Sequence, residues 1–68
     1  MNEIRSLGTN KAGIKEHILY TEDEKLKDMI LGYKGCRLTN TYRLNAQRHG
    51  WDIVFPSSLK TTVQSLSK

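Results

Sequence analysis

The spacing of apolar residues in the first third of the chain predicts two helices. Asn10 is a typical N-cap residue, and Ile14 and Ile18 lie four residues apart, so the pattern favours a helix over 11–20. Gly13 is the one residue in this segment that opposes a helix.

A second helix is predicted from Thr21. Residues 21–24 read Thr-Glu-Asp-Glu, which has the spacing of a capping box and places acids in the first turn of a helix. Four apolar residues then follow at helical spacing: Leu26, Met29, Ile30 and Tyr33. Gly32 and Gly35 mark the end of this helix.

The segment 36–50 fits two patterns. As a helix over 39–49 it ends at Gly50 and places Asn40, Arg43 and Gln47 in one outward stripe. As a strand, apolar residues alternate with polar ones over most of 36–44. We adopt the helix as the leading interpretation and keep the strand as the alternative.

The pattern after Gly50 is typical of β-structure. Apolar and polar residues alternate over 51–55 and again over 59–63, and Pro56 interrupts the run between them. Two antiparallel strands joined by a short loop are expected here. The remaining segments are expected to form a flexible N-terminal arm (1–9) and a tail (65–68), which leaves 10–64 as a single domain.

Three helices followed by a β-hairpin are the order of a winged helix-turn-helix domain. Residues 38–54, which read LTNTYRLNAQRHGWDIV, carry the likeness, because a polar helix ends at glycine and runs into a strand. This segment resembles the recognition helix and first wing strand of small phage and bacterial regulators. The resemblance implies an α+β fold with three helices and a C-terminal β-hairpin. The alternative is two N-terminal helices packed on a three-stranded antiparallel sheet.

The resemblance also implies a set of DNA contacts. Helix 39–49 would lie in the major groove of double-stranded DNA, and hairpin 51–63 would touch the adjoining backbone. Arginine can bond guanine, and asparagine and glutamine can bond adenine, which are the contacts that read bases. The DNA-binding residues implied in this way are Asn40, Arg43 and Gln47 for bases, and Arg37, Thr39, Arg48 and Lys60 for phosphates.

Charge agrees with a phosphate-binding role. The net charge is +4, and residues 29–68 carry six lysines and arginines against the single acid Asp52. Residues 1–28 are nearly balanced. A one-sided basic segment is typical of a protein that binds a polyanion.

These observations predict a small DNA-binding protein that regulates transcription or recombination. It would act as a homodimer or a cooperative assembly, because one small module gives limited contact area. The alternative is a small protein-binding inhibitor or adaptor of a partner enzyme, with an apolar β surface formed by Ile53, Phe55, Leu59 and Val63. If 36–44 is extended, Tyr42 and Trp51 would instead form a stacking platform for single-stranded nucleic acid.

No enzymatic activity, metal or cofactor is expected. The soft metal ligands Cys36, His17 and His49 lack the paired spacing of a zinc site, and Cys36 has no neighbouring base. No apolar run approaches the roughly 20 residues of a membrane span, and the start of the chain does not resemble a signal peptide. We therefore expect a cytoplasmic protein.

Overall fold

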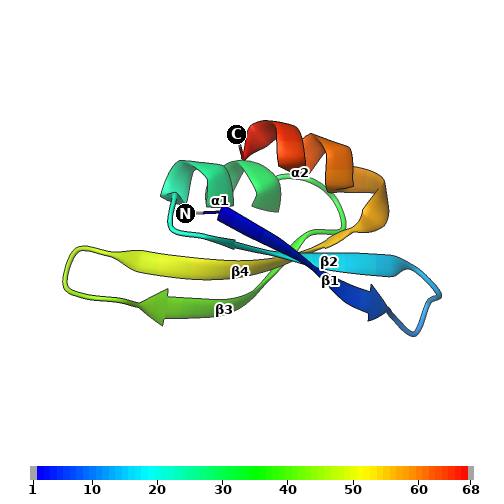
Figure 1. Ribbon diagram of the computed structural model, residues 1–68, viewed down its shortest axis with the longest axis horizontal. Helices are drawn as coiled ribbons and strands as arrows, with labels where there is room; N and C mark the ends of the chain where they lie inside the picture. The colour runs from blue at the N-terminus through cyan, green and yellow to red at the C-terminus, as the bar shows by residue number, and fades with distance from the viewer. Residues whose placement is uncertain (1, 68) are drawn as a thin grey trace.

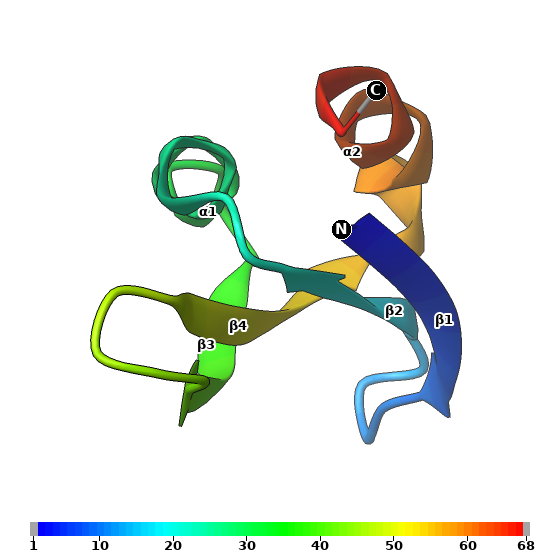
Figure 2. The ribbon, with the colours of Figure 1, turned by 60° about the vertical axis from the view of Figure 1, so that its left-hand side comes forward.

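Four strands form one antiparallel sheet, and two helices cover one of its faces (Figures 1 and 2). The computed structural model describes residues 2–67. In chain order the elements are β1 (Asn2–Thr9), β2 (Lys15–Thr21), α1 (Glu24–Leu31), β3 (Arg37–Arg43), β4 (His49–Pro56), the 3-10 turn η1 (Ser57–Leu59) and α2 (Lys60–Leu66). Within these residues no helix has the length and apolar character needed to cross a membrane.

The strand order is β1-β2-β4-β3, so β2 and β4 are central and β1 and β3 are edges. Leu19 of β2 pairs with Ile53 of β4, and both side chains lie under the helices. Because side chains alternate between the two faces of a strand, the residues directly before and after Leu19 and Ile53 point to the face that no helix covers. We call that side the open face; it carries Glu3, Arg5, Glu16, Ile18, Tyr20, Arg37, Asn40, Tyr42, Asp52 and Val54.

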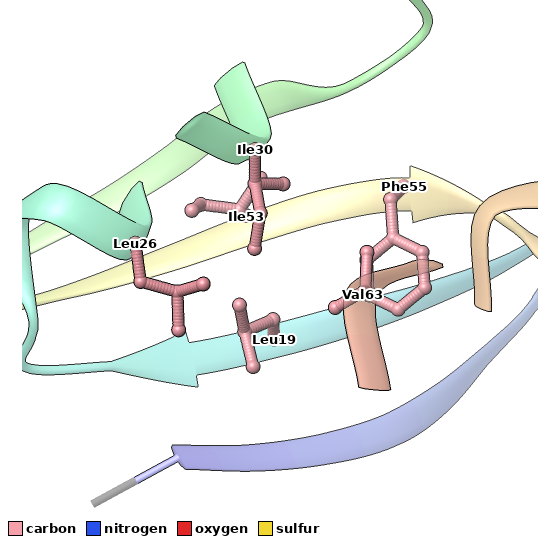
Figure 3. Close-up of a cluster of buried hydrophobic side chains, with 6 residues drawn as sticks. All are labelled: Leu19, Leu26, Ile30, Ile53, Phe55 and Val63. Atoms are coloured by element: carbon pink, nitrogen blue, oxygen red, sulfur yellow. The ribbon is translucent and has the colours of Figure 1, made fainter. Parts of the chain in front are cut away.

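The hydrophobic core fills the space between the sheet and the two helices (Figure 3). Its buried members are Leu19, Leu26, Ile30, Ile53, Phe55 and Val63, each at most 2% exposed. The two central strands supply half of this cluster, and the helices supply the rest. Both helices are therefore held on the sheet by the same small set of contacts.

The helix expected after Thr21 is confirmed as α1, although its N-cap is a different residue. Asp23 has an extended backbone, and its Oδ1 accepts hydrogen bonds from the backbone N–H groups of Lys25 (3.0 Å) and Leu26 (3.3 Å). Thr21 lies at the end of β2, and its Oγ1 accepts a hydrogen bond from the Asp23 N–H at 3.0 Å. The expected cap at Thr21 is therefore wrong, because Asp23 is placed to satisfy the free N–H groups of the first turn.

The segment 39–49 is not a helix. It begins within β3 and ends at the first residue of β4. Between the strands, Asn45 Oδ1 accepts hydrogen bonds from the backbone N–H groups of Gln47 and Arg48, both at 2.8 Å, and this local bonding stabilises a turn. The extended alternative for 36–44 is the one that the structure shows.

The three-helix winged helix-turn-helix fold is therefore wrong. The described residues contain two α-helices and four strands. The alternative of two N-terminal helices on a three-stranded sheet is also wrong, because the sheet has four strands and one helix is C-terminal. Both interpretations lacked the hairpin that begins the chain.

The helix expected over 11–20 is replaced by a turn and β2. Asn10 Oδ1 accepts hydrogen bonds from the backbone N–H groups of Ala12 (2.8 Å) and Ile14 (3.1 Å). Gly13 adopts a φ of +80°, a conformation that favours glycine. Asn10 thus shapes a β-hairpin where a helix cap was expected.

The two ends of the chain also differ from expectation. The segment expected as a mobile arm forms the edge strand β1, which pairs with β2 along its length. The strand expected over 59–63 is the start of α2, since Leu59, Val63 and Leu66 have helical spacing and all contact the core. Met1 and Lys68, which belong to the expected arm and tail, lie outside the described residues.

Candidate nucleic-acid interface

One end of the sheet gathers basic side chains from segments far apart in the sequence. The β1–β2 turn lies at the right of Figure 1, the start of α2 lies above it on the helix side, and β3 begins nearer the middle of the sheet. Glu16 of β2 pairs with Pro56 at the end of β4, and a Cβ added to Gly35, just before β3, would lie 3.5 Å from Pro56 Cγ. We call this region the basic end; its cationic residues are Lys11, Lys15, Lys34, Arg37 and Lys60.

The lysines of the basic end are free of acidic partners. All four are exposed, and none forms an ion pair with another described residue. Arg37 donates a hydrogen bond from Nη1 to Glu16 Oε2 at 2.9 Å, so the one acid in this region is already neutralised. The five cations of the basic end and the one acid, Glu16, sum to a charge of +4, which equals the net charge of the whole chain.

The Arg37–Glu16 pair gives a prediction about pH. The hydrogen bond from Arg37 lowers the pKa of Glu16 below its ordinary value of 4.5, although desolvation opposes the shift. A folded-state pKa below the unfolded value adds stability above about pH 4.5, and this stability is lost as pH falls through the folded-state pKa. Replacing Arg37 with glutamine should therefore flatten the acid side of the stability profile, measured by urea unfolding at a series of pH values.

Arg43 supplies the control for this experiment. It carries the same charge on the same strand, and within residues 2–67 it has no acidic partner. The Arg43→Gln profile should run parallel to that of the unmodified protein. An Arg37→Gln profile that also ran parallel would show that the pair does not shift the titration of Glu16.

Outside the basic end the chain carries six lysines and arginines and six acids, so it has no net charge. Glu22 and Glu24 lie where β2 passes into α1, and they line a cleft of about 210 Å³ together with Arg48. Arg48 donates a hydrogen bond to Glu22, which lowers the pKa of Glu22. The net positive charge of the chain therefore lies at the basic end.

The residues expected to contact DNA do not form one surface. Arg37 and Arg48 are paired with acids, and both Thr39 and Asn40 bond to Asp52, through Thr39 Oγ1 to the Asp52 carbonyl at 3.3 Å and through Asn40 Nδ2 to Oδ2 at 3.2 Å. The other three expected residues are exposed, and their side chains form no hydrogen bond or ion pair with another described residue: Arg43, Gln47 and Lys60. They lie on β3, on the β3–β4 turn and on α2, so no outward stripe exists.

Tyr42 and Trp51 do not form the stacking platform that an extended 36–44 would give. Trp51 is 9% exposed and lies on the helix side, with Lys27 Nζ 5.0 Å from its ring centroid. Tyr42 lies on the open face, where its neighbour is Tyr20, with ring centroids 6.0 Å apart and planes at 56°. The aromatic pair on the accessible surface is therefore Tyr20 and Tyr42.

Asp52 fixes the position of Tyr42. Its carboxylate is 3% exposed and accepts a hydrogen bond from the Tyr42 hydroxyl at 2.5 Å. This bond, followed by desolvation, raises the pKa of Tyr42. The hydroxyl of Tyr20 donates to Glu22 at 3.3 Å, and burial is the first cause of its raised pKa. Both phenols thus stay protonated, and both rings are anchored at their outer ends.

The apolar β surface expected for a protein partner is also absent. Ile53, Phe55 and Val63 are core residues at 1% exposure or less, and Leu59 is partly buried against them. The residues that carry potential chemistry remain apart as well. Within residues 2–67, no three histidine, cysteine or acidic side chains gather as metal ligands, and burial raises the pKa of the Cys36 thiol, which disfavours a nucleophilic thiolate.

Lys11, Lys15 and Lys34 were missed as candidate site residues. The sequence places Lys11 and Lys15 in the half of the chain that has no net positive charge. Only the hairpin at Asn10 and the antiparallel pairing of β2 with β4 bring them to the end of the sheet at which β4 ends and the chain continues to Lys60. A turn signal at Asn10, interpreted as a hairpin, was the one feature of the sequence that could have located them.

The fold and site define a two-layer α+β protein with one basic end and an uncovered sheet face. Comparisons with family models, with curated proteins and with solved structures find no match to this chain.

Proposed function

We propose that this chain binds nucleic acid through its basic end, with Lys11, Lys15, Lys34 and Lys60 contacting phosphates. The observation that carries the proposal is the separation of charge. The net charge of the chain is concentrated at one end, on lysines that have no acidic partner among the described residues. A lysine ammonium is a compact point charge that suits phosphate without demanding one geometry.

The spacing of these lysines fits an extended phosphate backbone. The sheet is four strands wide, so the basic end spans about 14 Å from the β1–β2 turn to β3. Several phosphates of one strand lie within such a distance. Because the proposed contacts are made by lysines to phosphates, the expected binding follows the backbone and not the base sequence.

The proposal predicts a strong dependence of affinity on salt. If four lysines each neutralise a phosphate, a plot of the logarithm of the binding constant against the logarithm of the salt concentration should have a negative slope. The expected slope is about −3.6 for duplex DNA and about −2.8 for a single strand. Fluorescence polarisation of labelled oligonucleotides across a salt series measures both slopes. A polyglutamate peptide of equal charge serves as the competitor.

Three results would overturn the proposal. They are no binding at low salt, an affinity that ignores salt, and displacement of the oligonucleotide by polyglutamate at equal charge. The second result would instead favour the alternative of an inhibitor or adaptor that binds a partner protein.

A further inference from the structure

We infer that the open face makes this binding selective for single strands, by stacking an unpaired base on Tyr20 and Tyr42. This inference rests on the proposed function and adds the class of nucleic acid. The two tyrosines come from β2 and β3, which flank β4 in the sheet, and the alternation along each strand places their side chains on the open face. A base within a duplex has both of its faces covered by neighbours, so only an unpaired base can reach these rings.

Gly50 makes room for the tyrosine pair. It lies on β4 opposite Tyr42, and a Cβ added to it would meet the Tyr20 hydroxyl at 2.5 Å. The Tyr20 ring therefore occupies the space that any other residue at position 50 would need. With their hydroxyls bonded to Glu22 and Asp52, the two rings are held in place before any ligand binds. Pre-ordered rings lose little conformational entropy on stacking.

The tyrosines line a shallow depression of about 390 Å³ on the open face. Leu44 adds apolar surface, and Arg5 offers a guanidinium. This volume lies in the range of small-ligand sites, which is about 300–1,000 Å³. Aromatic faces beside a guanidinium are the groups on which single-stranded nucleic acids stack.

Arg5 places a cation beside the two rings, and this pairing favours a nucleotide as the occupant. Lys15 lies about 17 Å from Tyr20 along β2 and stands on the helix side with Leu19, so it does not border the depression. Arg5 pairs with Ile18 between them, is exposed, and has no ion pair within the described residues. An unpaired nucleotide on the open face would thus meet Arg5 for its phosphate and the two rings for its base.

Two acids border the depression and have to be weighed against this arrangement. Asp52 already accepts hydrogen bonds from Tyr42 and Asn40, so its charge is partly compensated. Glu3 stands on the same edge strand as Arg5, which offsets it. The phosphate is expected over Arg5 and not over either carboxylate, because like charges repel.

The experiment compares single-stranded and hairpin-duplex oligonucleotides of about 12 nucleotides by fluorescence polarisation, with Tyr42→Ala as the main variant. Loss of one stacking ring should weaken single-strand binding by about 5- to 100-fold and leave duplex binding unchanged. Tyr42→Phe keeps the ring and should bind single strands nearly as the unmodified protein does. Circular dichroism and urea unfolding confirm that each variant is folded.

Tyr33 provides a matched control. It is 41% exposed, against 40% for Tyr42, and it follows α1 on the helix side of the molecule. Tyr33→Ala should bind both forms normally. The stacking inference would be overturned if Tyr42→Ala weakened single-strand and duplex binding equally, or weakened neither. It would also be overturned if the unmodified protein showed no preference for single strands. Salt-dependent binding to both kinds of oligonucleotide would still stand in each case. Failure to bind either form would overturn the proposed function itself.

Discussion

Replacing Phe55 with alanine is expected to unfold most of the protein. Phe55 is fully buried in the core between the sheet and the helices (Figure 3). Its ring stacks on that of His17, with centroids 5.6 Å apart. Truncation of a buried phenylalanine costs about 3–5 kcal/mol. A chain of 68 residues has a total free energy of unfolding of about 3–10 kcal/mol, so this single cavity consumes much of it.

Urea denaturation followed by far-ultraviolet circular dichroism measures this loss. Tyr33→Ala removes a similarly large aromatic side chain from the surface, and it should change the free energy of unfolding by less than about 1 kcal/mol. If Phe55→Ala were as stable as Tyr33→Ala, the core that the two helices share with the sheet would not be the one that the structure shows.

Replacing all four lysines of the basic end with glutamine is expected to abolish most nucleic-acid binding. The variant Lys11→Gln/Lys15→Gln/Lys34→Gln/Lys60→Gln loses the charges that the proposal assigns to phosphates. At low salt its affinity should fall by about 100-fold or more, and the salt slope should approach zero. Because all four side chains are exposed and unpaired among the described residues, the fold should be retained.

A pair of double variants separates location from net charge. Lys11→Gln/Lys15→Gln and Lys25→Gln/Arg43→Gln each remove two positive charges, but the second pair lies away from the basic end. The first variant should lose roughly half of the salt slope, and the second should change it little. Equal losses in both would show that binding follows net charge alone and that the basic end has no special role.

The elements that could be predicted from the sequence are those whose apolar residues repeat with a single spacing, that of a helix or that of a strand. α1 has acids before an apolar stripe, and Leu26 and Ile30 on that stripe are buried. The strand expected over 51–55 lies within β4. In α1 burial on one face dominates the pattern; 51–55 is buried on both faces, but its alternation of Trp51, Ile53 and Phe55 with Asp52 and Val54 still has the spacing of a strand.

In the segments that were assigned wrongly, the spacing of apolar residues does not distinguish a helix from a strand. In β2, Ile18 lies on the open face beside the buried Leu19, so apolar residues occupy both faces and the alternation is obscured. Ile14 stands at helical spacing from Ile18, yet it is 49% exposed. In β3 a register shift between Leu38 and Asn40 breaks the period of two.

The candidate site was harder to predict than the fold because tertiary pairing creates it. Arg37 and Arg48 look like free cations in the sequence, but they bind Glu16 and Glu22, which precede them by more than twenty residues. Lys60 was expected to contact phosphate, and it does lie at the basic end. Its neighbours there arrive from the first hairpin, which the helical interpretation of 11–20 concealed.

The most direct test of the basic end is a titration of the nitrogen-15-labelled protein with a short oligonucleotide at low salt, followed by amide chemical shifts. The largest changes are expected at the β1–β2 turn around Lys11 and Lys15, at Lys34 and at Lys60. Changes confined to the outer side of the helices, around Met29 and Tyr33, or an unchanged spectrum with excess oligonucleotide, would contradict binding at the basic end.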